Sequence, residues 1–270
     1  MKNISPLQLV IFDWAGTTVD HGCCAPTIAF IKGFKQYGVD ITMAQAREPM
    51  GMEKRDHIAA VGKIEEVKKK WQKIHNRAMS EEDIDEMYQN FRVLLLEALR
   101  ENNGVISGVV DTIAWLRTQG LKIGGSTGYF KEAADIVEQV AAAEGYTPDY
   151  SISATEVPAG RPAPWMIYRV MEKLSVFPPH SVVNVGDTVV DMESARNAGV
   201  WAVGVARTGN LCGLSFSEFN TLPSGEKKTT VARAKQRLTK AGAHYVIDNV
   251  GEMPSVIEQI NKNLVHGNTP

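Results

Sequence analysis

The chain has 270 residues, of which 44% are hydrophobic and 22% charged, a composition typical of a globular protein with enough apolar side chains for a core. The 29 Lys and Arg residues nearly balance the 31 Asp and Glu residues, so no overall basic field exists that would attract a nucleic acid. Three cysteines are too few for a disulfide framework, and no apolar run approaches the roughly 18 residues of a membrane span, which together predict a cytoplasmic protein that contacts no membrane.

Five short apolar runs predict the strands of a parallel β-sheet. A continuous apolar run is typical of a strand that is buried on both faces, as in sheets covered by helices on both sides. The first run ends in the carboxylate of Asp13. In chain order the runs are Leu7–Asp13, Leu121–Ser126, Ser181–Val185, Trp201–Val205 and His244–Ile247.

Helical patterns lie between the strands of this predicted sheet. Alternation of strands and helices predicts an α/β fold with a doubly wound parallel sheet, right-handed crossovers and a functional site at the carboxyl ends of the strands. The basic segment Lys227–Lys240 carries an apolar stripe, which favours a solvated amphipathic helix over a nucleic-acid site. The other predicted helices are Val109–Gln119, Lys131–Ala143, Pro164–Leu174 and Met192–Ala198.

The segment from about Ala25 to Gly104 breaks this alternation because its patterns are helical throughout. Ser80 begins a segment typical of a helix N-terminus, apolar residues then recur at helical spacing, and Asn102–Gly104 is a helix stop. We therefore expect an all-helical cap domain over residues 21–104. It would be inserted into an α/β core domain formed by residues 1–20 and 105–270.

Carboxylates follow two of the predicted strands. Asp13 ends the first strand, and Asp187 comes shortly after the third. Because the carboxyl ends of parallel strands meet at one edge of a sheet, the two residues would form an oxygen-ligand site suited to Mg²⁺. Taken alone, such an Asp more often caps the following turn. Asp191 would lie near the same face if a helix begins there, although an acidic residue also fits the helix dipole.

Small and hydroxyl-bearing residues near the strand ends would provide donors for an anion. The segment Gly16–Thr18 would let backbone N–H groups approach an anion closely, and Ser126–Gly128 offers a hydroxyl and an N–H after the second strand. Arg161, held between glycine and proline, would be a bidentate anion clamp. Each signal is weak alone, but their order along the chain is specific.

This order of motifs resembles the haloacid dehalogenase superfamily of aspartate-nucleophile phosphotransferases, and the inserted cap resembles its type 1 members. Five strings narrow the resemblance to the phosphonatase family, from the N-terminus to about Arg207, whereas the tail after Leu214 adds nothing specific. The strings are IFDWAGTTVD (Ile11–Asp20), PMGMEKRDH (Pro49–His57), STGY (Ser126–Tyr129), VPAGRPAPW (Val157–Trp165) and GDTVVDM (Gly186–Met192).

The resemblance implies an activity and a set of site residues. It implies Mg²⁺-dependent cleavage of the carbon–phosphorus bond of phosphonoacetaldehyde, a small-molecule phosphonate, by a homodimer. Asp13 would be the nucleophile, and Mg²⁺ would be held by Asp13, the backbone carbonyl of Ala15 and Asp187. Thr127 and Arg161 would neutralise the phosphoryl oxygens.

Ala15 marks a departure from the wider superfamily. Its phosphatases and mutases have an Asp two residues after the nucleophile, which protonates an alkoxide leaving group. Cleavage of a carbon–phosphorus bond leaves a carbanion, which needs an electron sink instead. Lys54 would supply that sink as an imine with the substrate aldehyde. A helix lysine is ordinarily a solvated surface charge, but the missing acid and the surrounding string favour the catalytic interpretation.

Five further residues are predicted near the substrate. His57 would share a helix face with Lys54 and shuttle protons, or would be a surface histidine. Cys23 would border the site or only fill space, and Tyr129 would line the aldehyde pocket or only pack. Gly51 and Gly128 are expected to contact the substrate.

Two alternatives stay open at this point. One is another hydrolase of the superfamily, a phosphatase or a dehalogenase; dehalogenases also lack the second Asp but need no metal. The other is a non-catalytic phosphoryl-binding protein on the same fold. The joint presence of Asp13, Lys54 and Asp187 argues against the second.

Overall fold

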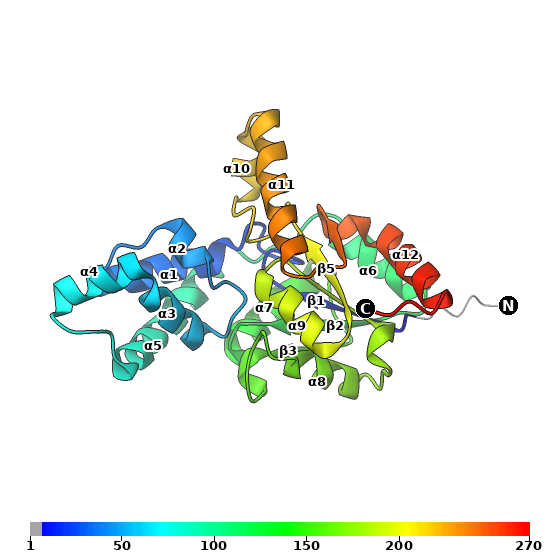
Figure 1. Cartoon of the computed structure of the whole chain (residues 1–270), viewed down its shortest axis with the longest axis horizontal. Coiled ribbons are helices and arrows are strands. Elements are labelled where there is room, and N and C mark those ends of the chain that lie inside the picture. The colour runs from blue at the N-terminus through cyan, green and yellow to red at the C-terminus, as the bar shows by residue number, and fades with distance from the viewer. Residues whose placement is uncertain (1–6) are drawn as a thin grey trace.

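A sheet of six parallel strands forms the centre of the molecule (Figure 1). The structure is a computed structural model and describes residues 7–270, so residues 1–6 of the predicted core lie outside it. The strand order is β3-β2-β1-β4-β5-β6. The strands are β1 (Leu9–Asp13), β2 (Lys122–Thr127), β3 (Tyr150–Ser153), β4 (Val182–Gly186), β5 (Trp201–Val205) and β6 (Tyr245–Ile247).

Apolar clusters cover both faces of the sheet. The side chains of β1 alternate between these two faces. Val10 and Phe12 belong to one apolar cluster, and Leu9 and Ile11 belong to the other. This arrangement confirms the doubly wound α/β fold. Helices α6 (Val109–Thr118), α7 (Lys131–Ala143) and α12 (Met253–Val265) contribute to the first cluster, and α8 (Trp165–Lys173), α9 (Val189–Ala198) and α11 (Ser224–Lys240) contribute to the second.

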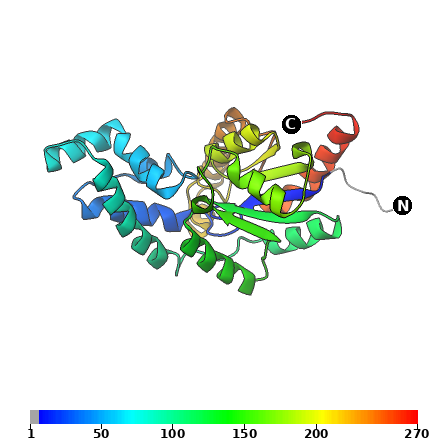
Figure 2. The same cartoon turned by 90° about the horizontal axis from the view of Figure 1, so that it is seen from below.

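The chain between β1 and α6 is helical and lies to one side of the sheet (Figures 1 and 2). The two segments that connect the insertion to the core lie side by side, since the N–H of Asp20 donates to the carbonyl of Gly104 at 3.1 Å. The helical character of this insertion is as expected, whereas the boundaries at 20/21 and 104/105 stay a prediction. Its helices are α1 (Cys24–Gln36), α2 (Met43–Arg47), α3 (Lys54–Lys63), α4 (Glu65–His75) and α5 (Glu81–Ala98).

Several elements differ from the sequence-based expectations, and helices α10 (Phe216–Thr221) and α12 were not predicted at all. β3 was not expected; it is an edge strand in which only Ile152 and Ser153 are buried, so it carries no apolar run. α9 begins at Val189 rather than Met192, because Thr188 caps it three residues earlier. The remaining elements are short 3-10 helices at Ala154–Glu156, Pro179–Ser181 and Val250–Glu252.

The amphipathic helix expected near the C-terminus is α11, which begins at Ser224 and extends away from the sheet beside α10 (Figure 1). Ala234 and Leu238 on its apolar stripe are buried, and the basic residues around them are mostly solvated. Across residues 7–270, each helix falls short of the length and apolarity that a bilayer crossing requires.

Candidate active site

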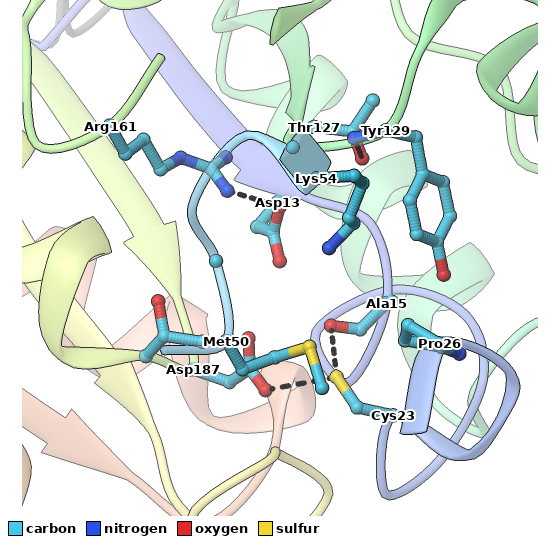
Figure 3. Close-up of a pocket in the computed structure, with 13 residues that line it drawn as sticks. Asp13, Ala15, Cys23, Pro26, Met50, Lys54, Thr127, Tyr129, Arg161 and Asp187 are labelled. Atoms are coloured by element: carbon cyan, nitrogen blue, oxygen red, sulfur yellow. Dashed lines mark hydrogen bonds and ion pairs between the residues drawn. The ribbon is translucent and has the colours of Figure 1, made fainter. Parts of the chain in front are cut away.

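A small cavity lies where the carboxyl ends of β1, β2 and β4 meet the insertion (Figure 3). Its volume is about 20 Å³. It brings together the predicted catalytic, substrate and metal residues except His57, whereas Asp191 and the anion-donor candidates Gly16–Thr18 and Ser126 do not line it. Three lining residues were not singled out from the sequence: Pro26, Met50 and Thr188. The complete lining is Asp13, Ala15, Cys23, Pro26, Met50, Gly51, Lys54, Thr127, Gly128, Tyr129, Arg161, Asp187 and Thr188.

The carboxylate of Asp13 is held by a buried arginine (Figure 3). Arg161 Nη1 lies 2.9 Å from Asp13 Oδ1, and Arg161 Nε lies 3.0 Å from Asp191 Oδ1. Nη2 of the same guanidinium donates to the carbonyl and the hydroxyl of Ser126 at 3.0 and 2.7 Å. The predicted anion clamp therefore has four of its five N–H groups directed at protein oxygens. Arg161 orients Asp13, and the second N–H of Nη1 is left for a phosphoryl oxygen.

Three buried carboxylates form a cluster at the floor of the site. Oxygen atoms of Asp13, Asp187 and Asp191 lie within 4.8 Å of one another. Burial and the two neighbouring carboxylates raise the pKa of Asp187 well above its usual value. Burial also raises the pKa of Asp191 to about 6, against the opposing charge of Arg161. Such a cluster is unfavourable without a cation among the oxygens.

The donor atoms of this cluster fit a divalent cation. Among the described residues, Asp187 Oδ1 is buried and has no hydrogen-bond partner. Asp191 Oδ1 also accepts no hydrogen bond among the described residues, but it forms an ion pair with Arg161 Nε, and Oδ2 accepts from the N–H and hydroxyl of Thr188. Asp13 and Asp187 therefore fit the role of direct ligands, and Asp191 fits the supporting role that was predicted for it.

Cys23 contacts two of the predicted metal ligands (Figure 3). Its thiol lies 3.1 Å from the carbonyl oxygen of Ala15 and 3.5 Å from Asp187 Oδ2. Burial and the charge of Asp187 raise the pKa of this thiol, so it is a neutral donor. Gly16 is required beside it, because its φ is +83° and an added Cβ would lie 2.3 Å from Asp187 Oδ2.

Lys54 is buried although it is a lysine at the first position of helix α3. Only 3% of it is exposed, and its Nζ lies 5.3 Å from the ring centroid of Tyr129 and 5.7 Å from that of Phe30. Within residues 7–270 its amine forms no ion pair. Burial lowers the pKa of Lys54 to about 8, with the negative charge of Asp13 acting in the opposite direction. Figure 3 shows this amine and the Asp13 carboxylate facing the same space.

His57 is fully buried, so the alternative of a surface histidine is wrong. Its ring stacks on Phe30 with the centroids 3.7 Å apart, and its Nε2–H donates to the carbonyl of Ala46 at 2.8 Å. Burial and the charge of Lys54 lower its pKa well below the usual value, so the ring is neutral. It lies behind the cavity wall, and its role as a proton shuttle stays a prediction.

Tyr129 and Thr127 form one wall of the cavity. The Tyr129 N–H donates to Thr127 Oγ1 at 3.1 Å, which leaves the hydroxyl proton of Thr127 for another acceptor. The hydroxyl of Tyr129 is buried and, among the described residues, has no hydrogen-bond partner. Burial raises the pKa of Tyr129 well above its usual value, so the phenol is neutral. Two neutral O–H donors therefore border the cavity.

Two glycines let the insertion contact the core through main chain. Gly51 has a φ of +96°, and a Cβ there would lie 2.4 Å from Thr188 Oγ1. A Cβ at Gly128 would lie 2.9 Å from the carbonyl oxygen of Gly51. Neither position tolerates a side chain in this arrangement, which is the physical reason for glycine at both.

Residues 7–199 match the family model of haloacid dehalogenase-like hydrolases. The chain belongs to this family. Among the curated relatives of this haloacid dehalogenase-like hydrolase is a phosphonoacetaldehyde hydrolase from Parabacteroides distasonis, 45% identical over 97% of this chain and 98% of the relative. Another, from Nitratidesulfovibrio vulgaris, is 40% identical over 98% of this chain and 95% of the relative.

Solved structures show the same similarity. A phosphonoacetaldehyde hydrolase-like protein from Oleispira antarctica superposes on this haloacid dehalogenase-like hydrolase with a TM-score of 0.97 at 38% identity, covering 99% of this chain and 97% of that one. A β-phosphoglucomutase from Clostridium difficile has a TM-score of 0.68 at 17% identity, covering 96% and 99%, and shares the fold alone. The resemblance to the phosphonatase family is thereby confirmed.

Proposed function

We propose that this protein hydrolyses phosphonoacetaldehyde to acetaldehyde and phosphate. The observation that carries the proposal is the buried amine of Lys54 in the same cavity as the carboxylate of Asp13. Ala15 stands where an acid for an oxygen leaving group would be, so the cavity offers a nucleophile and an electron sink but no such acid. The names of the relatives point to the same substrate.

Lys54 activates the substrate carbon. Its uncharged amine adds to the aldehyde, and the adduct takes up a proton and loses water, which gives an iminium ion flanked by the rings of Phe30 and Tyr129. When phosphorus departs, the electron pair of the carbon–phosphorus bond moves into the iminium and leaves an enamine. Protonation on carbon and hydrolysis of the resulting imine then release acetaldehyde and restore the amine.

Asp13 receives the phosphoryl group. Its carboxylate, held by Arg161, attacks phosphorus in line with the departing carbon. The hydroxyl of Thr127 donates to a phosphoryl oxygen, and Arg161 balances the charge that moves onto the group. Water then attacks phosphorus, which releases phosphate and restores the carboxylate.

Mg²⁺ is the cofactor that the donor set fits, with Asp13, Asp187 and the Ala15 carbonyl as the residues that would hold it. When bound, it would supply the positive charge that offsets repulsion between the carboxylates and the phosphoryl oxygens. The cluster of three carboxylates favours this metal-dependent function over dehalogenation.

The proposal is tested by incubating the purified protein with Mg²⁺ and phosphonoacetaldehyde and measuring both products. We expect equal amounts of acetaldehyde and phosphate, and far slower release of phosphate from simple phosphate esters. Faster hydrolysis of the esters would favour a phosphatase. Absence of both products would favour a phosphoryl-binding protein.

Ala15→Asp should leave phosphonoacetaldehyde cleavage no faster, because a carbon leaving group takes its electrons into the iminium. Hydrolysis of phosphate esters should rise, by no more than about 10²-fold, the lower end of what a positioned general acid contributes. Initial rates on both substrates measure this, and Ala15→Asn is the control of equal size without the acid. A large gain in phosphonoacetaldehyde cleavage would show that protonation of the leaving group limits the reaction.

Formation of the imine should depend on pH through Lys54. With a pKa of about 8, the amine is mostly protonated and unreactive below that pH and becomes nucleophilic above it. We expect the rate at which cyanoborohydride fixes acetaldehyde to the metal-free protein to rise through about pH 8 and then level off. A rise postponed to the range of exposed lysines, about pH 10, would contradict the burial of this amine.

The homodimer, the cytoplasmic location and the domain boundaries belong to the proposal as well. They rest on the family resemblance and the sequence. Light scattering of the purified protein tests the dimer, because a scattering mass near 29.6 kDa would indicate a monomer. Limited proteolysis near residues 20 and 104 tests the boundaries.

A further inference from the structure

A buried arginine connects the insertion to the core at a second point. Arg47 is the last residue of α2 and only 9% exposed. Its Nη1 donates to the carbonyl of Gly22 and to Oδ1 of Asn210, the latter at 3.2 Å. No carboxylate of residues 7–270 forms an ion pair with it. Burial of a guanidinium without an ion pair is costly in free energy. The side chain of Arg47 is therefore held in this position by its hydrogen bonds to Gly22 and Asn210.

Asn210 forms hydrogen bonds both with Arg47 and with a carboxylate of the active site. The residue follows β5 in the core and is 4% exposed. Its Nδ2 donates to the carbonyl of Arg47 at 3.0 Å, so the two residues are bonded in both directions. Its backbone N–H donates to Oδ2 of Asp187. One residue thus contacts both the insertion and a carboxylate at the floor of the site.

The adjacent glycine shows how closely this segment lies against the carboxylate. A Cβ at Gly209 would be 2.4 Å from Cβ of Asp187. With Oδ2 held by the Asn210 N–H, Oδ1 of Asp187 is left without a protein partner among the described residues and faces the carboxylate cluster. Asn210, together with the weaker contact from the Cys23 thiol, therefore determines which oxygen of Asp187 is available to a cation.

We propose that Arg47 and Asn210 are positioning residues. They couple the docking of the insertion against the core to the orientation of the Asp187 carboxylate. When the insertion is seated, Arg47 fixes the side chain of Asn210, and Asn210 fixes Asp187. When the insertion lifts, Arg47 leaves with it, and Asp187 loses its fixed orientation. The inference rests on the proposed function, because it takes Asp187 as a ligand of Mg²⁺.

A second arginine of the insertion provides a matched control. Arg92 on α5 also contacts the core, through an ion pair with Glu132 of α7 at 2.7 Å. Its side chain is 31% exposed, and neither residue lines the cavity. Arg92 thus joins the same two parts of the chain without a path to Asp187.

The test measures Mg²⁺ affinity of the substrate-free protein by titration calorimetry. Arg47→Met and Asn210→Ala should each weaken binding by about 10-fold, the scale at which residues that orient metal ligands act. Asn210→Ala keeps the backbone N–H and removes only the link to Arg47. Arg92→Met should bind Mg²⁺ like the unchanged protein, and Asp187→Ala should lose most of its binding. Circular dichroism selects variants that are folded.

The double variant separates this coupling from a general loss of stability. Both substitutions break the same link between Arg47 and Asn210. The Mg²⁺ affinity of the double variant should therefore equal that of whichever single variant binds Mg²⁺ less tightly. Unchanged affinity in folded Asn210→Ala, or fully additive losses, would overturn the inference. Failure of the proposed function is seen separately: an unchanged protein that binds Mg²⁺ but releases no phosphate refutes the activity and leaves the coupling standing.

Discussion

Lys54→Arg should lose at least about 10⁴-fold in turnover, the scale reached when a nucleophile is removed from a catalytic unit. The guanidinium keeps the positive charge and can still lie over the rings of Phe30 and Tyr129. It stays protonated, however, and cannot condense with an aldehyde. Lys54→Arg should therefore be nearly as inactive as Lys54→Ala.

Reduction with borohydride tests directly whether Lys54 forms an imine and Lys54→Arg does not. In the presence of acetaldehyde, borohydride should inactivate the unchanged protein irreversibly and attach a two-carbon group to the peptide that contains Lys54. Lys54→Arg should acquire no adduct in that peptide. Lys63→Arg, an exposed lysine at the far end of the same helix, should behave like the unchanged protein. Substantial turnover by Lys54→Arg would reduce Lys54 to an electrostatic contact and remove the main chemical support for the proposed activity.

Asp13→Asn should abolish phosphate release to a similar extent. An amide is a poor nucleophile and a weaker ligand for Mg²⁺ than a carboxylate, and it no longer balances the charge of Arg161. The substitution preserves size, so the fold should hold. The measurement is phosphate release, together with mass spectrometry of the Asp13 peptide to exclude deamidation.

The same variant distinguishes the two halves of the reaction. Imine formation at Lys54 precedes attack on phosphorus, so borohydride should still attach acetaldehyde to Asp13→Asn. Loss of the adduct would mean that Asp13 acts in imine formation instead. Appreciable turnover without deamidation would mean that another residue attacks phosphorus.

Much of the site could be predicted because its residues follow strand ends. Asp13, Thr127 and Asp187 come directly at or after apolar runs, and parallel strands bring such positions to one edge. The sheet register shows this, since Asp13 pairs with Ser126 across β1 and β2. Among the strands, only β3 was not predicted, because an edge strand with a single fully apolar buried side chain leaves no continuous apolar run.

What could not be predicted depends on contacts between distant segments. Arg161 has a local sequence typical of an anion clamp, but its partners in the fold are Asp13 and Asp191. Arg47 and Asn210 are 163 positions apart, and neither belongs to a motif. No periodicity or spacing indicates such a pair, because each residue acquires its environment only when the insertion meets the core.

The small volume of the cavity has a consequence for the timing of the reaction. A space of about 20 Å³ holds about one water molecule, and phosphonoacetaldehyde needs several times as much. The close contact between Gly51 and Gly128 must therefore widen before the substrate fits. Bond making is then separated in time from exchange with the solvent. A molecule in which the insertion is crosslinked to the core beside this contact would therefore not accept the substrate.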